Sequence, residues 1–184
     1  MKATEQLKRE HDAVKLTLRI LEQACKRLED GQSVDTSHLE ELVDFFRTFI
    51  DRCHHAKEEN MLFAALQESL DPDDAERVGA LIKDHVTGRN LVRDLSFAIA
   101  EYKAGDARAA SAIVRHARNY ITLLNQHIDI EDNVLYPLAN KRLKEKKQDE
   151  LLREFDRLEE EQIGHGKHAE FHRMIEKLKA IYLP

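Results

Sequence analysis

The sequence of 184 residues contains no tryptophan, two cysteines, three prolines and six glycines. Two cysteines outside any Cys-x-x-Cys spacing predict free thiols in a reducing cytoplasm and argue against a disulfide framework. No run approaches the roughly 20 apolar residues that a membrane-spanning helix requires. The first residues also lack the apolar segment of a secretory signal. We therefore expect a cytoplasmic protein that is not embedded in a membrane.

The charge balance is acidic rather than basic. Charged residues make up 35% of the chain and hydrophobic residues 42%, with a net charge of −6. An acidic chain is a poor partner for nucleic acid, and the one basic run, residues 141–147, is interpreted as a solvated helix end. The length fits one domain with a single core. The composition is typical of long amphipathic helices.

Apolar residues recur at helical spacing along most of the chain, and turn residues divide this pattern into five helices. The expected boundaries are Gly31, an N-cap at Asp35 or Ser37, Asp71-Pro72, Gly105-Asp106 and a turn between Lys144 and Asp149. Pro137 is expected to kink or loosen the fourth helix. We predict an all-α fold in a single domain over residues 1–184. An up-down-up-down four-helix bundle covers about residues 4–146, and a fifth helix packed on it covers about residues 149–182.

Two segments share a pattern of ionisable residues. His54 and Glu58 lie four residues apart, as do His127 and Glu131, and each pair is followed by Asn, a hydrophobic residue, Leu and an aromatic residue. Residues i and i+4 of a helix share one face. Each pair can therefore bind one metal ion, or its carboxylate can reach a second ion.

A second repeat accompanies the first. A basic-acidic-His step ends at His11 and again at His85. One histidine on an apolar stripe is more often a satisfied core residue than a ligand. However, the turns are short and the residue counts on their two sides nearly equal, so the bundle brings both repeats to one height. Buried unpaired carboxylates are costly, and no Arg or Lys is expected in this layer. The predicted ligands of a dinuclear metal site are His11, His54, Glu58, His85, His127 and Glu131.

The first segment contains two adjacent histidines, His54 and His55, and two adjacent glutamates, Glu58 and Glu59, so one residue of each pair has to be assigned to the metal. Aligning the two repeats pairs His54 with His127 and leaves His55 opposite an isoleucine. We therefore assign His54 and Glu58 to the metal. We expect His55 and Glu59 to be a surface or flanking pair.

The predicted fifth helix carries three further histidines, His165, His168 and His172. His168 shares the apolar stripe of that helix with Phe171, whereas the other two lie towards its edge. Two interpretations stay open. His168 is an extra metal ligand or closes the pocket over a metal, or the three histidines form a packing or capping cluster.

The pattern His…His-x-x-x-Glu…His…His-x-x-x-Glu resembles the hemerythrin-like, or HHE cation-binding, domain family over at least residues 4–145. The resemblance implies a four-helix bundle that holds two non-haem irons, with terminal histidines and two bridging carboxylates. Oxygen-carrying members have a fifth histidine in a His-x-x-x-His step on the third helix, where this chain has Arg89. The pattern is closer to the broader bacterial group and to iron-centre repair proteins. The latter usually carry an N-terminal segment with a Cys pair, which this sequence lacks.

The donor set favours a pair of iron ions as the cofactor. Imidazole suits Fe, Zn and Cu, and carboxylate bridges favour two hard or borderline ions. Structural zinc prefers four closed ligands rich in Cys. Two classes of function remain: binding or sensing of O2 or NO with iron storage or delivery, and a di-iron enzyme that reduces peroxide or NO or repairs iron-sulfur centres. We favour the first class because no substrate pocket or redox-partner motif is recognisable.

Overall fold

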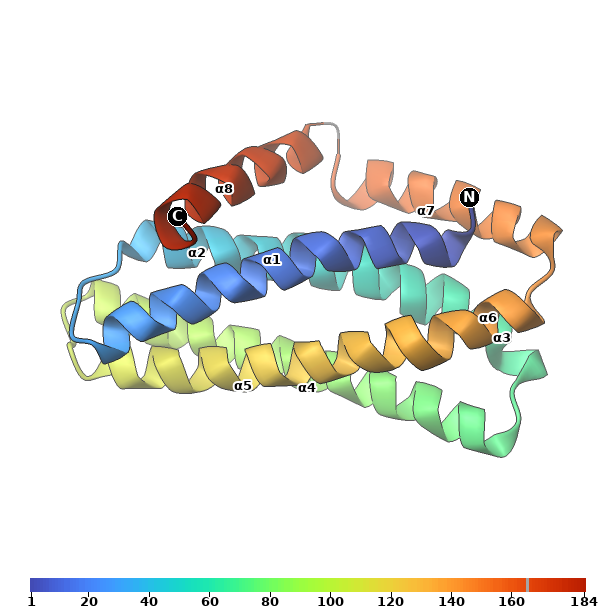
Figure 1. Cartoon of the computed structure of the whole chain (residues 1–184), viewed down its shortest axis with the longest axis horizontal. Coiled ribbons are helices and arrows are strands. Elements are labelled where there is room, and N and C mark those ends of the chain that lie inside the picture. The colour runs from blue at the N-terminus through green and yellow to red at the C-terminus, as the bar shows by residue number, and fades with distance from the viewer. Residues whose placement is uncertain (165) are drawn as a thin grey trace.

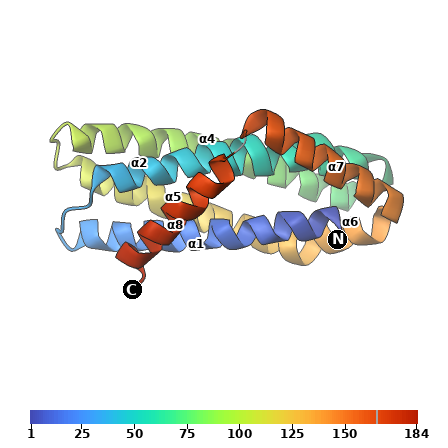
Figure 2. The same ribbon diagram turned by 90° about the horizontal axis from the view of Figure 1, so that it is seen from above.

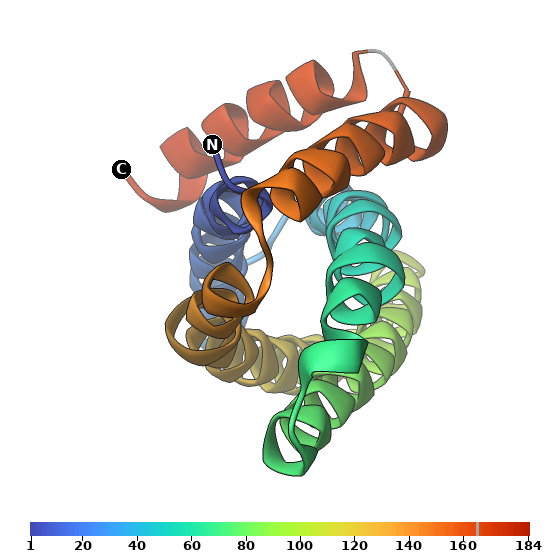
Figure 3. The same ribbon diagram turned by 90° about the vertical axis from the view of Figure 1, so that its right-hand side faces the viewer.

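A computed structural model describes residues 1–164 and 166–184 of the chain and, of Glu68, only the backbone. Within these residues the structure is helical with no strand. Four long helical segments run antiparallel to their neighbours along one axis (Figure 1). Seen end-on, they form a ring, with the C-terminal segment lying on one side of it (Figure 3). The predicted all-α, up-down-up-down bundle is confirmed.

Two of the four bundle segments are composite. The first is α1 (Ala3–Glu29), and the third is α4 (Pro72–Lys103). The second consists of α2 (Thr36–Phe45), η1 (Phe46–His55), η2 (Glu58–Leu62), α3 (Phe63–Leu66) and η3 (Gln67–Ser69). The fourth consists of α5 (Ala109–Ile130), η4 (Glu131–Leu135) and α6 (Tyr136–Arg142). Two further helices follow, α7 (Glu145–Gln162) and α8 (Lys167–Tyr182).

The turns between the bundle segments lie where the turn residues predicted them. Asp35 and Asp71 each accept a hydrogen bond at 2.9 Å from a backbone N–H in the first turn of the helix that follows. Pro72 occupies the first position of α4, where its missing N–H costs nothing. Gly31 and Gly105 have φ values of 74° and 101° just beyond the ends of α1 and α4. Glycine favours this left-handed conformation, which ends a helix.

Two of the bundle segments widen into π-helix where the predicted ligands lie. η1 ends at His55, η2 begins at Glu58 and η4 begins at Glu131. π-helical turns are rare and occur often at functional sites. η4 also lies just before Pro137, which cannot donate a backbone hydrogen bond to the preceding turn. The predicted loosening of the fourth segment near Pro137 is therefore confirmed.

The prediction of one fifth helix over residues 149–182 was wrong, because two helices occupy this region. α7 ends at Gln162, and Gly164 and Gly166 have φ values of 77° and 93°, which a right-handed helix does not contain. The chain turns there, and α8 crosses back over α1 and α2 (Figure 2). α7 packs instead on α1 and on the π-helical part of the second segment.

The hydrophobic core is divided into two clusters. On α1, Leu7 belongs to one cluster and Val14 to the other, with His11 between them. Phe155 of α7 joins the cluster of Leu7, and Phe171 of α8 joins the cluster of Val14. A buried polar layer thus separates two apolar halves. No helix in the described residues is long and apolar enough to cross a membrane.

Candidate metal centre

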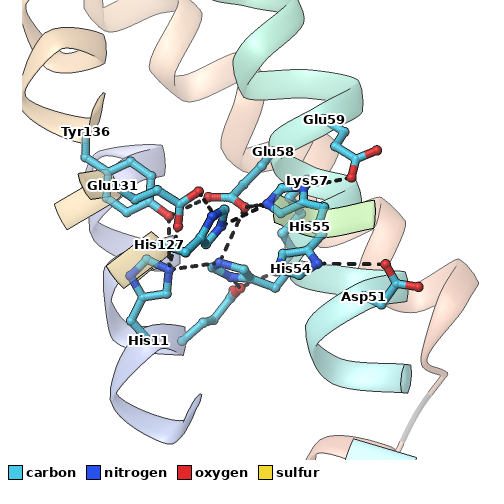
Figure 4. A network of polar contacts seen from close by, with 12 residues as sticks. His11, Asp51, His54, His55, Lys57, Glu58, Glu59, His127, Glu131 and Tyr136 are labelled. Carbon is cyan, nitrogen blue, oxygen red and sulfur yellow. Dashed lines mark hydrogen bonds and ion pairs between the residues drawn. The ribbon is translucent and has the colours of Figure 1, made fainter. Parts of the chain in front are cut away.

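The polar layer between the two core clusters contains all six predicted ligands. Every one of these side chains is at most 2% exposed. They come from all four bundle segments. The five that Figure 4 labels point toward a common centre. The structure therefore brings together His11, His54, Glu58, His85, His127 and Glu131.

The first of two candidate ligand groups combines His11, His54, Glu58 and Glu131. Each residue offers one atom, and these atoms lie within 4.8 Å of one another. The Nε2 atoms of His11 and His54 are 3.0 Å apart. This spacing is compatible with two imidazoles that face one small cation.

The second group combines Glu58, His85 and His127 with a residue that was not predicted, His55. The Nε2 atoms of His85 and His127 are 3.0 Å apart. His55 is 4% exposed, and its ring stacks on His85 with centroids 3.7 Å apart. The expectation that His55 takes a surface or flanking position was wrong, because its side chain is buried within the second group. That expectation rested on the alignment of the two repeats, which pairs His55 with an isoleucine and does not reveal the π-helical turns of η1.

The two carboxylates connect the groups. Glu131 places Oε1 3.1 Å from Nε2 of His127 and Oε2 3.3 Å from Nε2 of His11. Oε2 of Glu58 lies 3.7 Å from Nε2 of His54 and 3.5 Å from Nε2 of His85. Each carboxylate thus approaches one histidine of each group, which is the arrangement of a bridging ligand.

A second ring of carboxylates surrounds four of the histidines and contacts their outer nitrogen, Nδ1. The pairs are His11 with Asp132 at 2.9 Å, His54 with Glu10 at 2.7 Å, His85 with Glu59 at 2.7 Å and His127 with Asp84 at 3.3 Å. A carboxylate that accepts the Nδ1 proton fixes the ring and leaves Nε2 free to bind a metal. Sequence reasoning missed the role of these residues. The available signal was an acidic neighbour beside His11, His85, Glu58 and Glu131.

Comparison with known proteins agrees with this arrangement. The hemerythrin HHE cation binding domain matches residues 2–139. The chain belongs to the hemerythrin HHE family. Uncharacterized proteins of Mycobacterium tuberculosis and Mycobacterium bovis are 29% identical to it over 135 residues, which are 73% of this chain. The same alignment covers 52% of each relative, so the chain spans about half the length of the curated relatives it matches. No solved structure matches the chain at a significant level.

The electrostatics of this hemerythrin-like centre fit a cation. Burial and the nearby charge of Glu131 raise the pKa of the Glu58 carboxyl well above its usual value. Burial also disfavours the ionised form of Glu131, but His127 and His11 outweigh it and lower its pKa. Among the described residues, no hydrogen-bond partner meets Oε2 of Glu58 or either oxygen of Glu131. Buried acceptors without donors are costly, and a metal ion would satisfy them.

One buried lysine contradicts the expectation that no cation enters this layer. Lys57 is 0% exposed. Its Nζ donates to Oε1 of Glu10 at 2.7 Å and also to Oε1 of Glu159, which lies on α7. These contacts direct its charge away from the carboxylates of Glu58 and Glu131. The oxygens of Glu58 and Glu131 therefore remain available to a metal.

The aromatic residue after the second repeat also enters the site. The Tyr136 hydroxyl donates to Oε1 of Glu58 at 2.6 Å and lies 3.3 Å from Nε2 of His11. Its ring stacks on His11 with centroids 5.5 Å apart. The counterpart in the first repeat, Phe63, stacks on His85 at 6.1 Å and has no hydroxyl. The two halves of the centre thus differ in polarity.

His168 lies in neither ligand group. Its Nε2 lies 3.4 Å from Oε2 of Glu159, and its ring meets Phe49 edge-on. The side chain is 41% exposed, because α8 begins beyond the glycine turn and docks beside the polar layer rather than in it. His172 is exposed, and His165 lies outside the described residues.

Arg89 occupies the position at which oxygen-carrying hemerythrins have their fifth histidine. Its guanidinium pairs with Asp51 at 2.6 Å and with Glu59 at 2.5 Å. In this chain His55, on the second bundle segment, supplies a fifth histidine to the layer instead. A pocket of about 260 Å³ opens beside His55, with Asp51 and Arg89 among the residues that line it.

Proposed function

We propose that this hemerythrin-like chain is a non-haem di-iron protein that binds or senses O2 or NO, or handles iron. The observation that carries the proposal is the shared use of Glu58 by two buried ligand groups, with Glu131 reaching a histidine of each. Five imidazoles and two carboxylates suit a pair of borderline ions such as iron better than structural zinc. When bound, iron would supply a redox-active centre to which a small molecule can coordinate.

The protein's own residues would hold and orient such a pair. The outer carboxylates fix the ring orientation of four histidines and increase their basicity. The apolar clusters on both sides of the layer exclude bulk water. The group around His11 has two histidines and the group around His85 has three. We infer that a small ligand binds on the His11 side, where the Tyr136 hydroxyl is also located.

The decisive experiment is metal analysis and optical spectroscopy of protein purified from iron-replete cells. We expect two irons per chain. Addition of O2 or NO to the reduced protein under anaerobic conditions should change the spectrum, and removal of the gas should reverse the change. A protein that retains fewer than two irons, or that prefers zinc when both metals are offered, would contradict the proposal.

A di-iron reductase for peroxide or NO is the second candidate, and Tyr136 is the observation that favours it. Reduction of either molecule consumes protons, and the Tyr136 hydroxyl is a donor within the centre, hydrogen-bonded to Glu58 at 2.6 Å. An enzyme should turn over peroxide many times per chain. Tyr136→Phe should then lower the rate while both irons stay bound. A reversible spectral change on addition of O2 or NO, without turnover of peroxide, would favour binding or sensing over the reductase.

A further inference from the structure

The two halves of the internal repeat also differ at Lys57, which lies beside the candidate ligands. The offset that relates Glu58 to Glu131 relates Lys57 to Ile130. Lys57 is 0% exposed because α7 covers it, whereas Ile130 is 39% exposed. Figure 3 shows the C-terminal helices on one side of the bundle only. The repeat is therefore asymmetric where α7 packs.

A chain of polar contacts leads from α7 to a candidate ligand. Glu159 accepts a hydrogen bond from Nζ of Lys57, and the same Nζ donates to Oε1 of Glu10 at 2.7 Å. The other oxygen of Glu10, Oε2, lies 2.7 Å from Nδ1 of His54. Glu10 is thus shared between the ammonium group and the imidazole.

The corresponding contact in the other half has no such chain. Oδ2 of Asp84 lies 3.3 Å from Nδ1 of His127, and the position equivalent to Lys57 is the apolar Ile130. The contact between Nδ1 of His54 and Glu10 is therefore shorter than the contact between Nδ1 of His127 and Asp84. Only the first of these two contacts shares its carboxylate with the buried ammonium group of Lys57.

Glu159 determines how much of that positive charge acts on Glu10. Two further groups hold Glu159 in place: Nε2 of Gln6 donates to it at 3.1 Å, and Nε2 of His168 lies 3.4 Å from its other oxygen. Burial disfavours the ionised carboxylate, but His168 and Lys57 outweigh it and lower the pKa of Glu159 to about 2. An ionised Glu159 draws part of the Lys57 charge towards α7.

We propose that Glu159, on a helix beyond the part of the chain that matches the family, is a positioning residue for His54 that acts through Lys57 and Glu10. This proposal rests on the proposed di-iron function. It means that the two metal positions are chemically unequal. Glu159 keeps the negative charge of Glu10 directed at His54, which makes that imidazole a stronger donor to its metal. Without Glu159, Lys57 acts on Glu10 alone and weakens this donor.

The test compares Glu159→Gln with Glu160→Gln in the full chain. Glu160 is the next residue of α7 and is exposed, so its substitution makes the same change of charge without touching the relay. Co²⁺ is titrated into each metal-free protein, and two successive affinities and the visible spectrum are recorded. We expect Glu159→Gln to weaken one affinity by roughly 3- to 10-fold, less than the loss of a direct outer partner of a ligand. Its Co²⁺ spectrum should shift, while the other affinity stays within error.

Three outcomes distinguish a failure of the proposed function from a failure of the role proposed for Glu159. Wild-type protein that binds fewer than two ions contradicts the proposed function itself. Two ions in wild type with identical affinities and spectra for both variants contradict only the role of Glu159. An equal loss in both affinities, together with a lower unfolding temperature of the metal-free protein, shows a merely structural effect and overturns the proposal as well.

A second comparison tests the route through Lys57. In a Lys57→Met background, adding Glu159→Gln should leave the metal affinities unchanged, because no ammonium group connects Glu159 to Glu10. An additional loss of the same size as in wild type would show that Glu159 acts by another path and would overturn the proposal. Circular dichroism of each metal-free variant establishes that the helices are retained.

Discussion

At the level of single residues, four of the candidate ligand histidines use their two ring nitrogens differently. Nε2 of His11, His54, His85 and His127 faces the centre, and Nδ1 meets an outer carboxylate. His55 is the exception. Its Nδ1 lies 3.8 Å from Asp51, too far for a hydrogen bond. The fifth histidine is therefore the least constrained of the set.

The substitution His55→Ala tests its assignment as a ligand. We expect the iron content to fall from two towards one per chain, because the group around His85 loses one of its three histidines. The measurement is metal analysis after gel filtration. His116→Ala is the control, since His116 belongs to neither group. If His55→Ala retains both irons, His55 is not a ligand and serves only to pack against its neighbours.

Glu131→Gln tests the bridge. The amide has the size of the carboxylate but no charge, and Glu131 reaches histidines of both groups. We expect the affinity for both ions to fall, each by at least the roughly 10-fold seen for outer partners of ligands. The control is Glu101→Gln, which makes the same change at an exposed position of α4. If only one affinity changes, Glu131 binds a single ion and the bridge is absent.

At the level of elements, the C-terminal hairpin decides which side of the bundle is covered. α7 and α8 are joined by a turn with two left-handed glycines. This turn allows α7 to pack beside the polar layer while α8 crosses to the other core cluster. Lys57 is buried only because α7 lies over it. The part of the asymmetry that Lys57 introduces thus depends on how these two helices are connected.

Alanine substitutions at Gly166, in the turn, and at Gly79, within α4, are expected to have opposite effects on stability. Gly166 has a φ of 93°, so Gly166→Ala should destabilise the protein by roughly 1–2 kcal/mol. Gly79 lies within α4, and a Cβ there would meet nothing within 4 Å. Gly79→Ala should therefore stabilise it by about 0.4–1 kcal/mol. Thermal unfolding of the two variants gives the comparison, and an unchanged or higher unfolding temperature for Gly166→Ala would refute the assignment of the turn.

At the level of the whole molecule, a charged layer lies between two apolar halves. Such a layer is costly without a counter-charge. In the metal-free protein, burial and the charge of Glu131 raise the pKa of Glu58. Burial opposes protonation of His11 and His127, but neighbouring carboxylates outweigh it and raise their pKa values. Protons therefore take the place of metal ions in balancing the layer.

Metal retention should consequently fall with pH. Groups whose pKa is raised hold protons more strongly, and a metal must displace these protons to bind. Loss should begin as pH falls through the range near the usual histidine value of about 6.5. His54, whose pKa burial lowers to about 4, contributes only at lower pH. Metal content measured after equilibration between pH 8 and pH 4 gives the profile. Full occupancy down to about pH 4 would contradict a site dominated by histidines.

The sequence by itself determined the four-helix bundle and the six principal candidate ligands. Helical spacing needs only the local chain, and the caps at Asp35 and Asp71 are local hydrogen bonds. The repeat of candidate ligand types predicted that these residues lie at one height, because the turns are short and the residue counts from the ligands to each turn are nearly equal. The helix boundaries follow from neighbouring residues, and the common height of the candidate ligands follows from counting residues between turns.

Only the tertiary structure decided the inward position of His55, the burial of Lys57 and the position of His168. His55 lies in a π-helical turn, which the alignment of the two repeats did not reveal. Lys57 is buried by α7, a contact with Glu159 across about one hundred residues of chain. His168 depends on where the glycine turn directs α8. The burial of Lys57 thus rests on a long-range contact, which no local pattern records.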